Sequence, residues 1–311
     1  MKIRVLIFSF IVSCSYSSYS QEDLLFINGQ QALVHVNPSF AGSNGLFRTQ
    51  SLINNQTPVD KSQYKIFYNS VDAYIKPLNG GVAFTHEFKD VGSGTLQSSS
   101  FALSYAQYFS LGNEMRIIPS IQVAYLEKEL DKTKLSFNSI YHYIPDMDYP
   151  LQLSEVRPNR RCMDLGTGLL VNYKDFYFGA GAFHINKPNV GLVGDYVLPV
   201  RLSVHGSYNH RLNNWVFANI FAQFEKQGYY KSEGIKINFL MHQIILGIGH
   251  NTANGSNANL GYRNSFFTIG LSYNQRLSRP FSKIYGWWEA QLSINIRGKE
   301  HRRSVTAFER W

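Results

Sequence analysis

The sequence predicts an all-β protein, and more specifically a transmembrane antiparallel β-barrel of about 14 strands. Three observations lead to this fold class. Only 16% of the residues are charged while 15% are aromatic, against about 25% charged residues in ordinary soluble domains. Apolar and polar residues alternate along most of the chain, and the connections between the alternating segments alternate in length. The sequence has no run of about 18 apolar residues, which excludes a bundle of membrane-spanning helices.

The first 20 residues have the pattern of a secretory signal peptide. Two basic residues precede the apolar residues 5–12, and small residues follow up to Ser20, which is the order of regions in an export signal. Cys14 follows an Ile-Val-Ser stretch that resembles a lipobox. Cleavage near Ser20 and lipidation of Cys14 therefore both remain open.

Composition divides the rest of the chain into three regions. Residues 21–45 are a polar, periplasmic N-terminal segment, residues 46–297 form the barrel, and residues 298–311 form a basic C-terminal tail. If Cys14 is removed with the signal peptide, Cys162 is the only cysteine left. An intramolecular disulfide is then excluded, so the fold has to be stabilised by strand pairing and packing.

Period-two alternation defines the strands of the barrel. The clearest case is residues 288–296, in which Trp288, Leu292 and Ile294 alternate with polar residues. In order, the predicted strands are residues 46–54, 62–76, 79–89, 95–109, 114–128, 161–173, 176–186, 198–211, 215–226, 229–239, 243–251, 257–263, 265–276 and 286–297. Segments of about ten residues are long enough to cross a bilayer as tilted strands, and an even number suits a closed barrel.

The connections between these strands sort by length. Outer-membrane barrels have short periplasmic turns and longer outward loops. Here the even-numbered connections are tight, as at residues 77–78 and 174–175, and most odd-numbered ones are longer, above all residues 129–160. A soluble β-sandwich, the weaker alternative, has no reason to sort its connections in this way. We therefore expect both termini in the periplasm and residues 129–160 outside the cell.

Catalytic and ligand-binding motifs are not found in the sequence. Gly-x-Ser-x-Gly, His-Glu-x-x-His, Cys-x-x-Cys and phosphate-binding glycine loops are all missing. His86 and Glu87 are neighbours on a strand and point to opposite faces, while His205 faces the lumen and His184 lies near a strand end. Asp146 and Asp148 are a weak calcium alternative that lacks the glycine and glutamate of an EF-hand loop. The sequence predicts no catalytic residue, no cofactor and no metal site.

Two segments near the start of the chain resemble the opening of the PorP/SprF family. These are Asn37-Pro38-Ser39-Phe40-Ala41-Gly42 and Phe47-Arg48-Thr49-Gln50. Residues 157–168, 176–188, 269–273 and 289–293 are similar to the family's central block and closing hairpin. Ser39 and Phe40 depart from the commoner Ala and Tyr of the family, and Trp288 replaces a His.

The resemblance implies an outer-membrane component of the type IX secretion system, the export and gliding machinery of Bacteroidota. Its implied partners are other type IX secretion proteins, secreted substrates with their C-terminal domains, and outer-membrane lipid, without nucleic acid and without enzymatic activity. The candidate residues for partner docking or for a structural turn are Asn37, Pro38, Phe40, Ala41, Gly42, Arg48 and Gln50.

Two questions of function remain open in the sequence. The motif at residues 37–42 is expected at the periplasmic rim or within the barrel mouth, where it either docks a partner or plugs the barrel. A diffusion channel with a polar lumen is the alternative to an interaction protein, and a lipid-modifying barrel enzyme has the least support.

Overall fold

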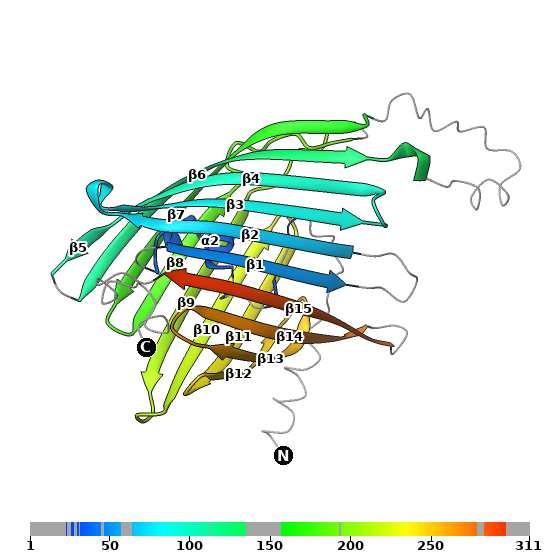
Figure 1. Cartoon of the computed structure of the whole chain (residues 1–311). Coiled ribbons are helices and arrows are strands. Elements are labelled where there is room, and N and C mark those ends of the chain that lie inside the picture. Colours follow the sequence, from blue (N-terminus) through cyan, green and yellow to red (C-terminus); the bar gives the residue numbers. More distant parts are fainter. Residues whose placement is uncertain are drawn as a thin grey trace, which may run out of the picture.

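The computed structural model describes residues 23, 26–27, 30, 32–44, 47–56, 64–112, 114–134, 157–192, 194–278 and 283–296. These residues form one closed antiparallel β-barrel (Figure 1). Its strands are β1 Phe47–Gln56, β2 Tyr64–Ile75, β3 Gly80–Val91, β4 Leu96–Gln107, β5 Phe109–Leu111, β6 Met115–Leu130, β7 Asn159–Tyr173, β8 Phe176–Phe183, β9 Arg201–Arg211, β10 Val216–Gln227, β11 Tyr230–Met241, β12 Ile244–Asn251, β13 Gly255–Arg263, β14 Phe267–Ser278 and β15 Lys283–Ile296. The short helices are α2 Leu33–Val36, η2 Pro38–Phe40, η3 Lys76–Leu78 and η4 Lys132–Lys134.

The barrel closes because its first and last strands pair. β1 and β15 are antiparallel neighbours, with Ser51 opposite Leu292. β4 and β5 both pair with β6 and are separated only by Tyr108, so together they occupy one strand position. The barrel therefore has 14 strand positions, and the predicted fold class and strand number are confirmed.

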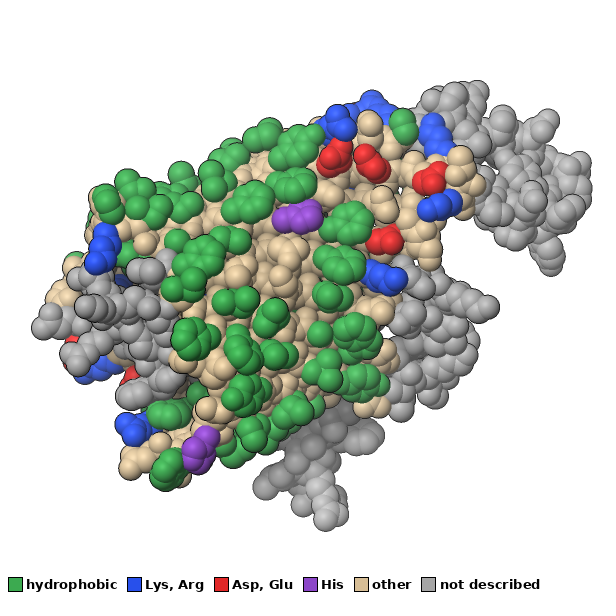
Figure 2. All heavy atoms as spheres, in the orientation of Figure 1, with side chains coloured by type: hydrophobic (Ala, Val, Ile, Leu, Met, Phe, Trp, Pro, Cys, Tyr) green, Lys and Arg blue, Asp and Glu red, His purple; other side chains and the backbone are tan. Residues whose placement is uncertain are grey.

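Alternation along each strand separates a lipid-facing surface from a lumen. Leu271 is 55% exposed, whereas its neighbour Ser272 is fully buried. Trp288 and Glu289 on the next strand show the same contrast. Hydrophobic side chains cover the outer face of the sheet in Figure 2, and the charged side chains of that view lie toward its ends. This distribution matches a barrel whose middle faces hydrocarbon.

The two ends of the barrel differ in their connections. One end, here called the turn end, carries η3 and the tight turns after β5, β7, β9, β11 and β13. The other, the loop end, carries the described residues 131–134, 157–158, 184–192, 194–200 and 252–254, together with two short connections at residues 92–95 and 228–229. From the length rule for outer-membrane barrels, we expect the turn end to face the periplasm. No helix among the described residues is long and apolar enough to cross a membrane.

Strand boundaries agree with the predicted ones to within three residues, and the largest differences lie at the end of β8, at the start of β9 and at the start of β15. β8 ends at Phe183, three residues earlier than predicted, because His184 adopts a left-handed backbone conformation (φ 58°) that turns the chain away from the ladder. β9 begins at Arg201, after Pro199, whose missing N–H is unsuited to a ladder.

Candidate functional site

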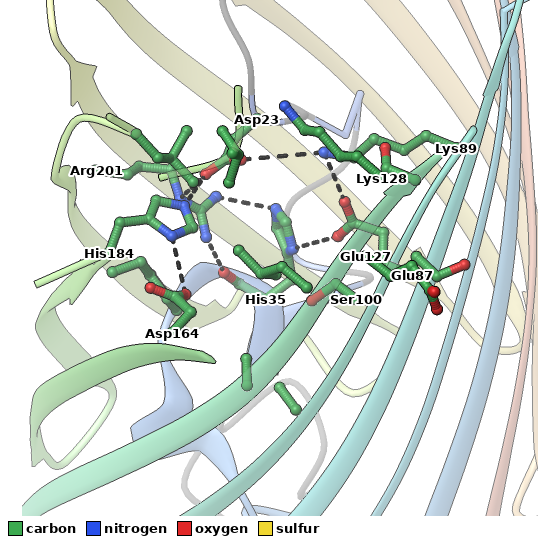
Figure 3. Close-up of a pocket in the computed structure, with 18 of the residues that line it drawn as sticks. Asp23, His35, Glu87, Lys89, Ser100, Glu127, Lys128, Asp164, His184 and Arg201 are labelled. Atoms are coloured by element: carbon green, nitrogen blue, oxygen red, sulfur yellow. Dashed lines mark hydrogen bonds and ion pairs between the residues drawn. The ribbon is translucent and has the colours of Figure 1, made fainter. Parts of the chain in front are cut away.

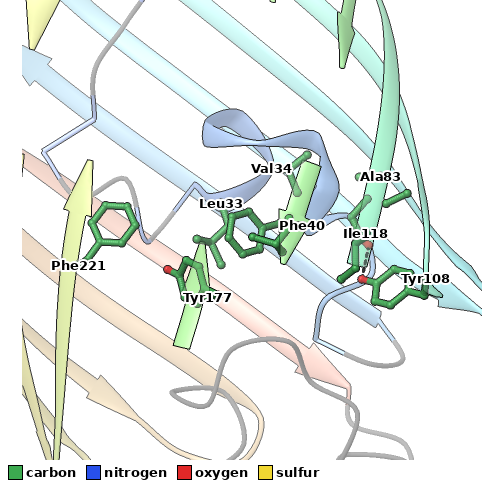
Figure 4. Close-up of a cluster of buried hydrophobic side chains, with 11 residues drawn as sticks. Leu33, Val34, Phe40, Ala83, Tyr108, Ile118, Tyr177 and Phe221 are labelled. Carbon is green, nitrogen blue, oxygen red and sulfur yellow. Dashed lines mark hydrogen bonds between the residues drawn. The ribbon is translucent and has the colours of Figure 1, made fainter. Parts of the chain in front are cut away.

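The lumen is occupied by the chain's own N-terminal segment. We call residues 23–44 the plug segment; of these, 23, 26–27, 30 and 32–44 are described. Leu33 and Phe40 of this segment pack against Leu170, Tyr177 and Phe221 from β7, β8 and β10 (Figure 4). Figure 1 shows α2 inside the sheet. The hydrophobic core of this barrel is therefore built between the plug segment and the inner faces of the strands.

Local chemistry explains the shape of the plug segment. Asn37 is extended after α2, and its side chain accepts a hydrogen bond of 2.9 Å from the Ser39 N–H, which caps η2. Pro38 occupies the first position of η2, where its missing N–H costs nothing. Gly42 has φ of 70°, a conformation that favours glycine, and leads the chain toward β1. The motif thus forms a defined turn.

Side-chain contacts attach this turn to the barrel wall. The Asn37 Nδ2 donates to the carbonyl oxygens of Leu169 and Ala180, at 3.0 and 3.2 Å. The Phe40 ring lies 5.4 Å from the rings of both Tyr177 and His205. Because these contacts reach β7, β8 and β9, the motif connects neighbouring strands from the inside.

Glycines in the strands provide the space for the plug segment. A Cβ at Gly81 of β3 would overlap the Ala41 carbonyl oxygen, and one at Gly168 of β7 would overlap the Asn37 Oδ1. A Cβ at Gly179 of β8 would lie 2.9 Å from the Asn37 Nδ2. The glycine-rich strands and the Asn-Pro motif are therefore two sides of one interface.

A buried ion pair joins the plug segment to the first two strands. The Arg48 Nε lies 2.8 Å from the Asp72 Oδ1, and both side chains are at most 1% exposed. The second Asp72 oxygen accepts a 2.9 Å hydrogen bond from the Gly42 N–H, and Arg48 also donates to the Ser43 hydroxyl. Charge-assisted bonds of this kind fix the geometry of the groups they join. Gln50 lies two residues after Arg48 on the same face of β1, and its side chain accepts a hydrogen bond of 3.4 Å from the Ser70 hydroxyl.

All seven residues proposed from the sequence as docking or structural residues lie in this region and are buried. They are Asn37, Pro38, Phe40, Ala41, Gly42, Arg48 and Gln50. We predicted the N-terminal segment at the periplasmic rim or in the barrel mouth. The structure places its described residues within the lumen, with Gly42 beside Gly81 near the turn end and Asp23 near the loop end.

A cavity of about 760 Å³ occupies the loop end of the lumen. Asp23 enters it from the plug segment, where its N–H donates to Gln227, the last residue of β10. Figure 3 shows charged side chains converging here from several elements. The charged and histidine residues that line it are Asp23, His35, Glu87, Lys89, Glu127, Lys128, Asp164, His184 and Arg201.

One part of this network is centred on His35. The Arg201 guanidinium lies 3.0 Å from the His35 Nε2 and can only donate, so that ring nitrogen is the acceptor. The other ring nitrogen, Nδ1, lies 3.2 Å from Glu87, which also binds Lys89 at 3.0 Å. His35 therefore links Arg201 to Glu87 through its two ring nitrogens.

The other part is centred on His184. Its Nε2 contacts the Asp23 Oδ2 at 2.5 Å and its Nδ1 contacts the Asp164 Oδ2 at 2.9 Å. Burial by itself would lower the pKa of His184, but the two carboxylates outweigh it and raise the pKa to about 9. Burial would likewise raise the pKa of Asp23, yet the charges of His184, Arg201 and Lys89 hold it well below its ordinary value. Asp23 and His184 thus form an ion pair at neutral pH.

The sequence analysis did not predict this charged cluster or the fit of the glycines to the plug segment. It did predict on which face of β3 some of the cluster's residues lie. His86 and Glu87 do point to opposite faces, since His86 stacks on Phe101 at 4.5 Å outside and Glu87 binds His35 inside. Glu87 and Lys89 are two residues apart on β3 and so share the lumen face. Among the described residues, no group of three or more His, Cys, Asp or Glu side chains is arranged to hold a metal ion.

Fold and site together define a class: an outer-membrane β-barrel of 14 strand positions whose lumen is filled by its own N-terminal segment. Comparison with known families adds the particular membership. The family model for the type IX secretion system membrane protein PorP/SprF matches residues 19–295, and the chain belongs to this family. The resemblance noted in the sequence is thereby confirmed.

Several solved structures are similar to this chain at low sequence identity. Omp33 of Acinetobacter baumannii is 8% identical, with 82% of this chain and 100% of that chain covered and a TM-score of 0.47. The toluene transporter TbuX of Ralstonia pickettii is 11% identical, with 85% and 92% covered and a TM-score of 0.49. The toluene transporter TodX of P. putida is 9% identical, with 84% and 93% covered and a TM-score of 0.47. A search of the curated proteins gave no match.

Proposed function

We propose that the protein is a non-enzymatic component of the type IX secretion system that supports export or surface attachment of substrate proteins. It does so by binding subunits of the machinery or the C-terminal domains of substrates, while the barrel anchors it in the outer membrane. Membership of the family supports the pathway. The plug segment within the lumen supports the interaction role.

The observation that carries the proposal is the burial of polar side chains across the lumen. Many polar side chains on the lumen face of β9 to β15 are less than 9% exposed; examples are Ser203, His205, Asn219, Lys236, Asn238, Ser272, Asn274 and Glu289. A water-filled diffusion channel would leave such side chains wet. The diffusion channel inferred as the alternative from the sequence is therefore the weaker proposal.

The same burial bears on where a partner binds. Asn37 and Phe40 are fully buried, so a partner cannot reach them while the plug segment is in place. The loop end offers both accessible connections and the charged cavity. We infer that partners engage the loop end, and that the motif at residues 37–42 acts by holding the plug segment.

Gene deletion followed by complementation tests the proposed role. Deletion should abolish export or surface attachment of one or more secreted proteins, and the wild-type gene should restore it. Complementation with Asn37, Pro38 and Phe40 all replaced by Ala should give low abundance of the heat-modifiable barrel, because the plug core is lost. If this variant accumulates normally but export fails, the motif itself docks a partner.

Conductance separates the interaction protein from the channel. The purified wild-type protein should show no stable open state in planar bilayers, whereas pull-down from outer membranes should recover secretion proteins. Steady conductance by the wild-type protein, together with intact export in the deletion strain, would reverse the proposal in favour of the channel.

A further inference from the structure

Asp23 occupies a position in the loop-end cavity that is built for a carboxylate. Three cations from separate elements meet it: Lys89 of β3, His184 after β8, and Arg201 of β9. Lys89 also forms an ion pair with Glu87, and His184 also forms one with Asp164. For Arg201, Asp23 is the carboxylate at ion-pair distance among the residues that the structure describes, with 3.4 Å between its Nε and the Asp23 Oδ2.

The wall around this position retains unused hydrogen-bonding capacity. The Arg201 Nε and the Asp164 Oδ1 are buried and make no hydrogen bond among the described residues. Arg201 and Asp164 are each 3% exposed. Buried polar atoms of this kind are usually satisfied, by protein or by a bound molecule. Both residues line the cavity, and the Arg201 Nε, which is a donor, could pair with a carboxylate that enters it.

The remainder of the cavity is suited to an apolar body. Val91, Leu96, Ala102, Leu126 and Phe183 line it beside the rings of Tyr64, Tyr68 and Tyr196. A volume of about 760 Å³ falls within the range of roughly 300 to 1,000 Å³ that small-ligand sites occupy. Apolar walls with a few convergent charged groups are the usual composition of such sites.

We propose that this cavity binds the carboxylate of an external ligand that has an apolar body, and that Asp23 is a tethered competitor for the same position. When the ligand is bound, its carboxylate replaces that of Asp23 between Lys89, His184 and Arg201. No bond is made or broken, and the exchange is one carboxylate for another. The inference does not depend on the secretion role.

The attachment of Asp23 permits such an exchange. Among the described residues, its polar contacts are the three ion pairs and one hydrogen bond of 3.2 Å from its N–H to Gln227. Leu33 and Phe40, by contrast, are packed in the hydrophobic core. Displacement of Asp23 therefore leaves the base of the plug segment seated. A tethered group competes at a high effective concentration, so its removal should expose the full affinity of the site.

Calorimetric titration of the purified full-length protein with 4-phenylbutyrate tests the site. Asp23→Asn should bind this carboxylate at least about tenfold more tightly than the wild type, and the neutral analogue 4-phenylbutanol should bind neither protein measurably. Asp175→Asn is the matched control, because Asp175 is exposed in the turn after β7, at the opposite end of the barrel. It should bind like the wild type.

The double variant Asp23→Asn/Lys89→Met should lose the gained affinity, with heat modifiability on gels verifying that both variants are folded. A hexapeptide with a free C-terminal carboxylate, compared with its amide, then shows whether the source is a peptide terminus or a small organic acid. The proposal is overturned if folded Asp23→Asn binds carboxylates no better than the wild type, or if the alcohol and amide bind equally well. These results leave the export experiment unaffected, so the two proposals fail independently.

Discussion

The two ends of the lumen are built on opposite principles. Near the turn end, the plug segment packs without space for a methyl group at Gly81 or Gly168, and its residues Gly42 and Ser43 bind the buried Arg48–Asp72 pair. Near the loop end, the same segment is held by Asp23 through ion pairs beside a cavity of about 760 Å³. Close packing specifies one arrangement, whereas ion pairs next to a cavity can exchange partners.

The comparison separates a structural region from a binding region within one lumen. The packed end explains how a barrel with a largely polar inner face acquires a hydrophobic core, since Leu33 and Phe40 pack against apolar side chains of the strands such as Leu170. The cavity end keeps charged groups convergent and accessible. Mutations should therefore affect stability at the turn end and ligand binding at the loop end.

The largest effect is expected for Gly81→Ala. The added Cβ would overlap the Ala41 carbonyl oxygen, and because that atom belongs to the backbone it cannot move by a rotamer change. We expect the free energy of unfolding to fall by about 3 kcal/mol or more, with little heat-modifiable barrel in the membrane. Gly206→Ala is the control, since its Cβ would have 3.5 Å to the nearest atom and should change stability by less than about 1 kcal/mol. Equal behaviour of the two variants would contradict the packed interface.

Arg48→Met ranks next. It leaves the carboxylate of Asp72 buried without its cation, which typically costs about 3 to 5 kcal/mol. Urea unfolding of the purified barrel measures this decrease in the free energy of unfolding. Lys174→Met removes an exposed ion pair with Glu114 at 3.2 Å and should have no measurable effect, because exposed pairs are screened by water. A similar loss in both variants would show that burial of the pair is unimportant.

A double-mutant cycle tests whether Asn37 and Gly168 form one interface. Asn37→Ala loses two buried hydrogen bonds and should cost about 1 to 3 kcal/mol. Gly168→Ala should also destabilise, because its Cβ meets the Asn37 side chain. In the Asn37→Ala background that contact no longer exists, so the combined loss should fall short of the sum by about 1 kcal/mol or more. Strict additivity would mean that the two positions do not touch.

The same positions show which features of the structure could be predicted from the sequence and which could not. The barrel could be predicted because the alternation of apolar and polar residues within each strand shows which side faces lipid. Leu271 and Ser272 differ in polarity, and the structure exposes Leu271 and buries Ser272. The turn at residues 37–42 could be predicted because Asn, Pro and Gly act on their own backbone. Its position inside the barrel could not, since the fit of Asn37 to Gly168 joins residues far apart in the chain, for which no local pattern exists.

The loop-end cavity shows the same limit more strongly. Asp23, Lys89, His184 and Arg201 come from four distant segments, and each one alone is an ordinary polar residue. Only closure of the barrel brings them together. The left-handed conformation of His184, which places its ring between two carboxylates, is equally invisible in a strand-forming stretch of sequence.

The smallest effect concerns pH and is confined to the loop end. The pKa of His184 is raised to about 9 by Asp23 and Asp164, above its unfolded value of about 6.5. A raised pKa means that the protonated form is stabilised by folding, so this contribution is complete below about pH 6.5 and is lost as the pH rises through about 9. The contacts of Asp23 with Lys89 and Arg201 do not involve His184, so the plug segment should loosen only in part.

Hydrogen exchange, corrected for its intrinsic pH dependence, measures this loosening. Protection of the backbone at Asp23 should fall between pH 7 and pH 10, while protection at Val34 in the packed core should stay constant, because no ionisable group belongs to that cluster other than tyrosines. In His184→Gln the pH dependence at Asp23 should disappear, since the titrating group is gone. Protection at Asp23 that increases with pH, or that changes in parallel with Val34, would show that the two ends of the lumen do not behave as separate regions.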